Sequence, residues 1–428
     1  MKRLSSAAPD FPAAFEALLG QARETTANVQ APVAAIIADV KARGDVALCD
    51  YTARFDRMQI TPARLRVTAA EIDAAVAQVA APLMAALDLA ATRIEAFHAA
   101  QMPADIDFTD AEGLRLGMRW GALDAVGLYV PGGKAAYPSS VLMNALPAKV
   151  AGVARVAMCV PTPDDVLNPL VLAAARRAGV SEIYRVGGAQ AVAALAWGTA
   201  TIAPVDRIVG PGNAYVAEAK RQVFGQVGID SIAGPSEVVI IASGDNNPAH
   251  VAIDLLAQAE HDEVAQAILI ADDAGFADAV VAAVAAELAI LPRSAIAGAS
   301  WRDHGAVIVV RDVAEAIALT NRLAPEHLQI MTPAPEAVFA RIRHAGAVFL
   351  GRFTPEAIGD YVAGPNHVLP TGRTSRFASG LSVYDFLKRT TWVAADAAGL
   401  ARIGPAAVAL AEAEGLGAHA RSVAVRLT

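Results

Sequence analysis

The chain of 428 residues is 55% hydrophobic and carries a net charge of −8 at pH 7. This length predicts more than one domain with a large buried core, and the negative charge argues against a nucleic-acid-binding protein. The most apolar helical run, residues 276–291, contains Asp278 and Glu287 and is too short for a bilayer span, so we expect a soluble protein.

The cysteines and the amino-terminal residues favour the cytoplasm. Only Cys49 and Cys159 occur, far apart and outside any CxxC motif, which excludes a disulfide framework and a thiolate zinc site. Cys159 lies in the apolar run 155–160 and is expected to be a buried thiol. The positively charged start leads into Pro9 and Pro12 instead of an apolar segment, so we predict no export signal.

Residues 12–100 show a helical pattern. Apolar residues recur at three- and four-residue spacing, and Thr68 with Glu71 has the spacing of a capping box. The pattern then changes to alternation, with β-rich runs at 114–120 and 125–130 that predict a hairpin or two sheet strands. This change of period predicts a structural boundary.

From residue 130 onward, short apolar strands alternate with helices, and Gly and Pro occupy the joints. The alternation restarts at residue 237 and predicts two α/β units, each with a mostly parallel sheet covered on both faces. The expected strands are 155–160, 182–186, 207–209, 237–242, 267–271, 306–310 and 347–350, and the expected helices are 166–178, 190–197, 214–224, 248–261, one from near 276, and 314–323.

Three glycine turns follow predicted strands and open into helices. They are tipped by Tyr129 in YVPGG, by Gln190 in VGGAQ and by Asn213 in VGPGN. Ligands of open α/β sheets bind at this edge, and helix amino termini attract phosphate groups. Because no GxGxxG or Walker A motif occurs, a phosphate-bearing cofactor and simple turn glycines both remain open.

A carboxylate and an imidazole stand side by side in the segment 324–328, as Glu326 and His327 after Pro325. Neutral imidazole is the usual general base near pH 7, and an adjacent carboxylate can tune it or activate water. The pair can therefore serve two proton transfers. The alternative is an ordinary Glu-His pair in a surface loop.

A metal site is the second hypothesis from residue types. The predicted helix 248–261 starts after Asn247, and Gln258 and His261 near its end share one face. Further ligands would come from Asp360 and from His367 or His419, but no HExxH or CxxC motif links them. The remaining histidines, which we expect to be structural or solvent-facing, are His98, His250, His304 and His344.

Longer blocks of sequence carry a family resemblance across about two-thirds of the chain. The blocks are VGLYVPGG, GGAQAVAALAWGT, GPGNAYVAEAKR, AGPSEV, AQAEHD, APEHL, GRFTPEAIGDYVAGPNHVLPT, SGLSVYDFLKRT and EGLGAHARSV. In this order they resemble the histidinol dehydrogenases. The resemblance implies a cytoplasmic, zinc-dependent homodimer that oxidises histidinol to histidine through the aldehyde, the last two steps of histidine biosynthesis, while two NAD molecules are reduced.

The resemblance also implies a role for each matching residue. Zinc would be held by Gln258, His261, Asp360 and His419, and NAD by Tyr129, Gln190 and Asn213. His327 would act as general base and Glu326 would activate water. The substrate would be contacted by Ser236, His367 and Glu414 together with the zinc ligands and the catalytic pair. The tail would cross to the partner subunit, so that Glu414 and His419 complete the partner's site.

The predicted fold class is α/β, with two incomplete Rossmann-like units, an N-terminal helical segment and a small C-terminal helical tail. We divide the chain into a helical arm, a larger α/β domain carrying the metal and catalytic residues, a second α/β domain facing NAD, and a tail without an obvious sheet. The respective ranges are 1–25, 26–129 with 237–380, 130–236, and 381–428.

Three alternatives to the histidinol reaction follow from the same residues. A diverged paralogue would oxidise a related amino alcohol; the departure from the family pattern at Glu263, where proline is expected, leaves this open. A zinc hydrolase would use Glu326 to activate a metal-bound water and would need no NAD. A third reading, a nucleotide-binding scaffold without catalysis, would tolerate the loss of His327.

Overall fold

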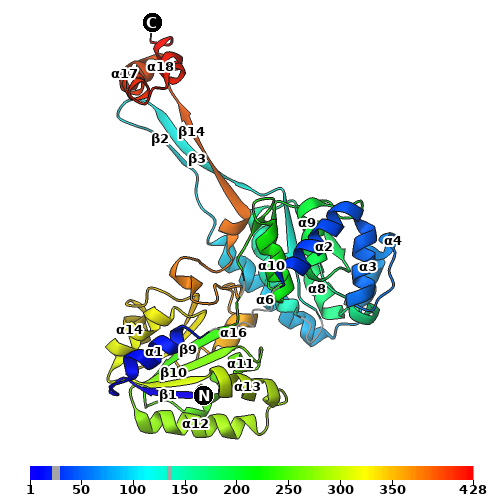
Figure 1. Cartoon of the computed structure of the whole chain (residues 1–428), viewed down its shortest axis with the longest axis vertical. Helices are drawn as coiled ribbons and strands as arrows, with labels where there is room; N and C mark the ends of the chain where they lie inside the picture. Colours follow the sequence, from blue (N-terminus) through cyan, green and yellow to red (C-terminus); the bar gives the residue numbers. More distant parts are fainter. Residues whose placement is uncertain (22–28, 133–136, 233, 428) are drawn as a thin grey trace.

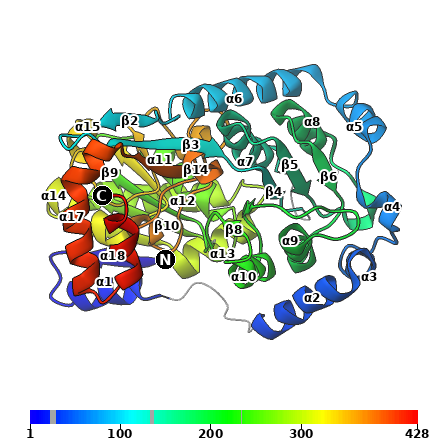
Figure 2. The same cartoon turned by 90° about the horizontal axis from the view of Figure 1, so that it is seen from above.

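The computed structural model describes residues 1–21, 29–132, 137–232 and 234–427. Within these ranges the strands form three sheets: a six-stranded sheet in the order β1-β11-β10-β9-β12-β13, a five-stranded sheet in the order β6-β5-β4-β7-β8, and a three-stranded sheet in the order β14-β3-β2. The first two are parallel and form the centres of two adjoining bodies, and the third forms a long arm (Figures 1 and 2). The predicted α/β class with mostly parallel sheets is confirmed.

The six-stranded sheet is the centre of the larger body. Its strands are β1 (Lys2–Ser5), β9 (Glu237–Ala242), β10 (Gln266–Ala271), β11 (Ala306–Val309), β12 (His327–Met331) and β13 (Ala347–Leu350). Every residue of β9 and β10 is buried, as their continuous apolar runs require for a sheet covered on both faces. The cover on one face is α11 (Pro248–Ala259), α12 (Ala274–Leu288) and α13 (Ser294–His304), and on the other α1 (Phe11–Leu19), α14 (Val313–Leu323) and α15 (Pro335–Phe339).

The five-stranded sheet organises the second body. Its strands are β4 (Ala125–Tyr129), β5 (Arg155–Cys159), β6 (Glu182–Tyr184), β7 (Arg207–Val209) and β8 (Gly228–Ile229). One core contains α5 (Ala69–Val76), α6 (Ala81–Ala99), α7 (Pro138–Ala151) and α8 (Pro169–Ala178). The other contains α2 (Gln30–Arg43), α3 (Asp45–Phe55), α4 (Pro62–Leu65), α9 (Gly188–Trp197) and α10 (Ala214–Val223).

This packing differs from the predicted grouping of residues 26–129 with residues 237–380. The described helices between residues 30 and 99 contact the second body, because α2 lies against α9, α5 against α8 and α6 against α7. An apolar stripe on a helix shows that this face is buried, but it does not show which sheet covers it. The sequence pattern therefore could not assign these helices to the second body. The exact domain borders stay a prediction.

The arm and tail also differ from expectation. Strand β14 (Leu387–Ala394) pairs antiparallel with β3 (Arg115–Ala122), which also pairs with β2 (Ile106–Thr109), so the prediction of a tail without a sheet was wrong. Of the two alternatives predicted for residues 114–120 and 125–130, two sheet strands are confirmed and a hairpin is excluded, because β3 and β4 belong to different sheets. Helices α17 (Ala397–Ala413) and α18 (Gly417–Ala424) lie at the tip of the arm, away from both bodies in Figure 1.

Local predictions at helix starts are confirmed, and the N-terminal arm needs a correction. Thr68 and Glu71 form the expected capping box, and Asn247 caps α11. The segment 1–25 is not wholly helical, because β1 pairs with β11 as an edge strand. The shorter elements are the helix α16 (Glu356–Tyr361) and the 3-10 turns η1 (Pro163–Asp165), η2 (Thr374–Arg376) and η3 (Val383–Phe386).

In the described part of the chain, no single helix is long and apolar enough to cross a bilayer. Helices α5 and α6 satisfy the length and composition criteria only as a pair, and they are bent by 112° at their junction.

A buried ion pair holds the glycine turn after β7. Lys220 and Asp230 form an ion pair, and both side chains are almost wholly buried. Lys220 Nζ donates to the carbonyl oxygen of Gly210 at 3.0 Å, and Asp230 Oδ2 accepts from the amide of Gly210 at 2.8 Å. The pair therefore fixes both polar groups of one turn residue whose φ of +113° favours glycine.

Replacing Lys220 by methionine should lower the free energy of unfolding by about 3–5 kcal/mol, because it leaves the Asp230 carboxylate buried without its cation. Urea unfolding followed by circular dichroism measures the loss. Arg221→Met is the matched control, since Arg221 is exposed and its pair with Glu218, one helical turn away, contributes about 1 kcal/mol or less. Equal losses in the two variants would contradict the assignment.

Candidate active site

The candidate site lies at the amino ends of strands in the larger sheet. His327 is the first residue of β12, and Ser236 directly precedes β9. A cavity of about 420 Å³ opens here. It is lined from the larger body by His327, Phe349, Asp360 and His367, and from the second body by residues that include Phe97. The site is thus enclosed between the two bodies.

His327 is buried, and its hydrogen bonds define which ring nitrogen can act. Its Nδ1 lies 3.1 Å from the carbonyl oxygen of Glu237. Because a carbonyl oxygen only accepts, Nδ1 carries the ring proton and Nε2 carries the lone pair. Nε2 is buried and has no hydrogen-bond partner among the described residues. The ring is therefore held as a neutral imidazole with one basic nitrogen available.

The surroundings of His327 favour the neutral ring. Burial is the largest influence and lowers the pKa of His327 from 6.5 to about 4, although the charge of Asp360 and the hydrogen bond to Glu237 act in the opposite direction. His261 and His367 lower it further. The imidazole is consequently unprotonated at neutral pH.

Glu326 is fixed by the same strand that holds His327. Its Oε2 accepts from the backbone amide of Glu237 at 2.9 Å and lies 3.8 Å from Nδ1 of His327. Only 5% of Glu326 is exposed. The reading of Glu326 and His327 as a surface pair was therefore wrong, because the loop after α14 enters the interior at Pro325.

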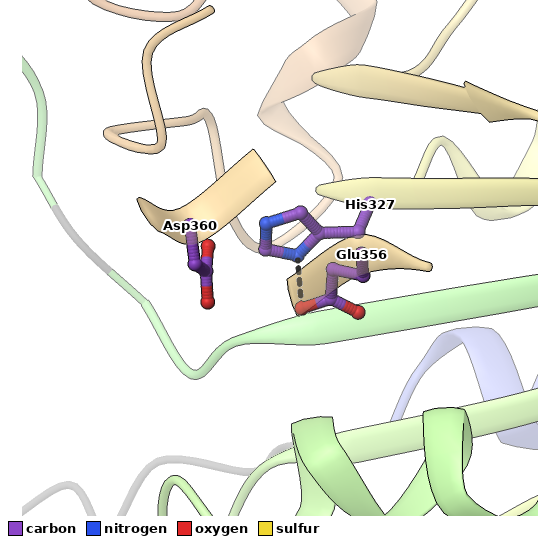
Figure 3. Close-up of side chains that lie close together, drawn as sticks. All are labelled: His327, Glu356 and Asp360. Atoms are coloured by element: carbon purple, nitrogen blue, oxygen red, sulfur yellow. Dashed lines mark ion pairs between the residues drawn. The ribbon is translucent and has the colours of Figure 1, made fainter. Parts of the chain in front are cut away.

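Helix α16 contributes two carboxylates, one of which the sequence analysis missed. Glu356 and Asp360 are four residues apart and so share one helical face. Glu356 Oε1 lies 3.5 Å from Nδ1 of His327, and Figure 3 shows both carboxylates beside the imidazole. The available signal was the four-residue spacing to Asp360, but the helix is too short for periodicity to reveal it.

The site concentrates negative charge around one histidine. Burial, followed by the charges of Asp360, Glu326 and Asp254, raises the pKa of Glu356 well above its usual value. His327, Glu356 and Asp360 offer ligand atoms within 4.8 Å of one another, the spacing of a candidate cation site. A bound cation would relieve the repulsion among these carboxylates.

The predicted zinc ligands of the larger body lie near one another. His261 Nε2 is 3.9 Å from Asp360 Oδ2, too long for a hydrogen bond and close to the distance of about 3.4 Å between two ligand atoms of one tetrahedral zinc. Gln258 is fully buried, and its amide touches His327 at 3.1 Å. This set of imidazole, carboxylate and amide donors fits a zinc ion.

His367 lies next to the same carboxylate. Its Nδ1 is 3.0 Å from the backbone oxygen of Asp360 and 3.9 Å from Oδ1 of that residue. Burial lowers the pKa of His367, with the charge of Asp360 opposing. His367 lines the cavity, and its contact to substrate stays a prediction.

Two predicted site residues lie elsewhere in this chain. Glu414 directly follows the last residue of α17 and His419 lies in α18, and both are exposed. These helices stand at the arm tip, far from α11 and α16 in Figure 1. A single chain thus does not bring Glu414 and His419 to Asp360.

The predicted NAD residues lie at the carboxyl ends of strands in the second body. Tyr129 is buried and its hydroxyl accepts from the amide of Gly188 at 3.1 Å; burial raises the pKa of Tyr129 to about 12. Gln190 is buried, and its Oε1 has no partner among the described residues. Asn213 is exposed and caps α10 through its side-chain oxygen. Gly133 of the first turn lies outside the described residues.

A pH dependence of stability follows from His327. Its pKa in the folded chain is about 4 and its ordinary value is 6.5, so the unfolded chain binds the proton first as the pH falls. In chelator-treated protein, stability should therefore fall between about pH 6.5 and pH 4, by about 3 kcal/mol at most from this residue.

Urea unfolding at a series of pH values measures this effect. His327→Gln should remove its share of the slope, whereas His344→Gln, at a residue outside the cavity, should leave the slope unchanged. The contribution of Glu356 has the opposite sign, because its raised pKa makes stability fall as the pH rises above 4.5. Because Glu356 is present in both proteins, the difference in slope between the native protein and His327→Gln gives the contribution of His327. An unchanged slope in His327→Gln would contradict the burial argument.

Comparisons with known proteins agree with this geometry. A family model described as histidinol dehydrogenase matches residues 19–427. The chain is 68% identical over 427 residues to a histidinol dehydrogenase of Gluconobacter oxydans (strain 621H), covering 100% of this chain and 99% of the relative. It is 63% identical over 426 residues to one of Rhodospirillum rubrum, with coverage of 99% and 98%.

A solved structure shows the same similarity in the fold. The crystal structure of histidinol dehydrogenase from Elizabethkingia anophelis is 37% identical and superposes with a TM-score of 0.96, covering 100% of this chain and 98% of that one. The match includes the whole of both bodies, the arm and the tail. The chain therefore belongs to the histidinol dehydrogenase family.

Proposed function

We propose that this protein oxidises histidinol to histidine through histidinaldehyde, in two successive hydride transfers to NAD. Family membership supports the oxidoreductase class and the place in histidine biosynthesis. The observation that supports the mechanism is His327, a buried neutral imidazole whose Nε2 lone pair has no partner in the described chain, at the wall of a cavity. Such a group can take a hydroxyl proton as hydride leaves.

Zinc is the proposed resident metal, held by Gln258, His261, Asp360 and, from the partner subunit's tail, His419. Bound zinc would supply a Lewis-acidic anchor for the imidazole and amine of the substrate and keep the aldehyde in place between the two oxidations. The mixed nitrogen and oxygen donors and the 3.9 Å gap between His261 and Asp360 support this assignment.

His327 would perform the proton transfers of both oxidation steps. Its Nδ1–H is held by the carbonyl of Glu237, so Nε2 is the nitrogen that accepts the proton. The imidazolium that forms lies 3.5 Å from Glu356 and 3.8 Å from Glu326. These carboxylates stabilise the positive charge that develops on the ring, which offsets the burial that disfavours it.

Glu326 would act between the two oxidations, on the water that adds to the aldehyde. Its carboxylate is oriented by the amide of Glu237 and shielded from bulk solvent. A carboxylate held next to the electrophilic carbon can remove a proton from the attacking water and so form the hydrated aldehyde. The aldehyde oxygen takes up the proton that His327 gained in the first oxidation, so the ring is neutral again and can take the hydroxyl proton of the hydrate in the second oxidation.

NAD is the proposed hydride acceptor, and it supplies the redox chemistry. Tyr129, Gln190 and Asn213 would contact it from the three turns at the carboxyl edge of the second sheet. This is the usual ligand edge of an open parallel sheet, and the unpartnered Oε1 of Gln190 supports the assignment.

The proposed assembly is a homodimer with exchanged tails. Glu414 and His419 are exposed and belong to the helical tip of an extended arm, which supports their delivery to the site of a second copy. The two unpaired cysteines support a cytoplasmic location.

The direct test follows NADH absorbance with histidinol as substrate, using zinc-loaded and chelator-treated protein. Reduction of two NAD per histidinol, lost on chelation and restored by zinc, is the expected result. Related amino alcohols serve as competing substrates and distinguish a diverged paralogue. Failure of metal-loaded protein to reduce NAD would overturn the proposed reaction.

Substitutions of the pair should separate the two half-reactions. Glu326→Gln should slow the oxidation of added histidinaldehyde by about 10²-fold or more and slow alcohol oxidation much less, because only the former needs water. His327→Ala should suppress both. Single-turnover measurements from each starting compound provide the comparison, and equal losses for the glutamate variant would contradict its assigned role.

Mixed dimers test the exchanged tail. A His419→Asn chain and a Glu326→Gln chain should each be impaired as homodimers, whereas their heterodimer has one site with both native residues if tails are exchanged. That site should restore up to about half of the native activity per dimer. The readout is NADH formation by purified heterodimers carrying two different tags. Absence of recovery would indicate sites built within one chain.

A further inference from the structure

The amide of Gln258 has a crowded environment on one side. One terminal atom of this side chain lies 3.1 Å from Nδ1 of His327, 3.2 Å from Oε1 of Glu356 and 3.3 Å from the carbonyl oxygen of Glu237. Gln258 itself is fully buried, so no bulk water competes for these contacts. If the amide nitrogen of Gln258 occupies this position, its oxygen faces the other way; if the oxygen occupies it, the nitrogen does.

The chemistry of the neighbours identifies that atom as the amide nitrogen. The carbonyl oxygen of Glu237 can only accept a hydrogen bond, so an amide oxygen facing it would leave two acceptors in contact. With the nitrogen there, the oxygens of Glu237 and Glu356 both accept, and only Nδ1 of His327, which donates its own proton to the same carbonyl, is not a hydrogen-bond partner. The two hydrogens on Nε2 of Gln258 are then directed at Glu237 and at Glu356.

We propose that Glu356 is a positioning residue that fixes the orientation of the Gln258 amide, so that Gln258 Oε1 is turned away from Glu356 and available as a ligand. This inference rests on the proposed function, in which Gln258 is a zinc ligand. An amide nitrogen has no lone pair to offer a metal, so the reversed amide would lose the ligand. Groups that orient a ligand in this way typically change metal affinity 10–100-fold.

The fold explains how Glu356 comes to hold this position. It is the first residue of α16, and α16 packs against α11, the helix that carries Gln258. The same short helix carries Asp360 one turn later. One element therefore presents both an expected ligand and the acceptor that orients a second ligand, and the side chain of Glu356 is 97% buried.

A different role for Glu356 is compatible with the same distances. With His327 and Asp360 it could contribute a ligand itself. The two roles predict different effects when the carboxylate of Glu356 is replaced. Glutamine retains a carbonyl oxygen that can accept from Gln258, whereas leucine retains only the volume; if the negative charge itself binds the metal, both substitutions should be equally harmful.

The test measures the rate of zinc release from the zinc-loaded dimer to excess chromogenic chelator, without substrate. Glu356→Leu should speed release 10–100-fold and Glu356→Gln less than about threefold. When Gln258 is already replaced by alanine, Glu356→Leu should have no more than about a twofold further effect, because no amide remains to be oriented. Equal rates for Glu356→Gln and Glu356→Leu, or a full leucine effect in Gln258→Ala, would overturn the proposal.

Glu356→Asp provides a milder version if the leucine variant does not fold. It withdraws the acceptor by one methylene group while retaining its charge, so release should still accelerate in the native background and not in Gln258→Ala. Urea unfolding of the zinc-free variants gives a readout that needs no metal, and the Glu356 and Gln258 substitutions should be non-additive there too. Additive effects on unfolding would count against the contact, whereas native protein that retains no zinc would refute the metal assignment alone.

Discussion

The backbone of Glu237 is the point on which the site depends. Its amide donates to Glu326 and its carbonyl accepts from His327, so one residue orients both members of the acid-base pair. This is possible because β9 and β12 are parallel neighbours, with His327 in register with Val238. The strands that form the most buried part of the larger body thus also hold the two proposed catalytic side chains in place through hydrogen bonds.

The location of the site follows from this arrangement. In most open parallel sheets ligands bind at the carboxyl ends of the strands. Here the larger sheet uses its amino ends, where α11 ends near Gln258 and α16 crosses α11, while the second sheet presents Tyr129, Gln190 and Asn213 from its carboxyl ends. The cavity opens between the two bodies, so chemistry and proposed hydride acceptor are supplied by different sheets.

Burial and charge act against each other in this cavity, and their balance gives the site its proton chemistry. Burial keeps His327 neutral and raises the pKa of Glu356, while the surrounding carboxylates favour any cation that forms or binds. Such a cluster is destabilising in isolation and is retained where a cation occupies it for part of the cycle. In the proposed reaction these cations are the imidazolium of His327 and the zinc held by Asp360.

The sequence by itself determined the α/β alternation and the helix caps at Thr68 and Asn247, and it singled out Glu326 and His327 as candidates, because these depend on local periodicity, local hydrogen bonds and contiguous motifs. It missed Glu356, placed the helices between residues 30 and 99 with the wrong sheet, and overlooked β14. Each of these depends on a partner far away in the chain, which an apolar stripe or a single carboxylate does not specify. Only the tertiary structure brought α16 onto α11 and β9 beside β12, since packing and pairing between remote segments decide which polar groups meet.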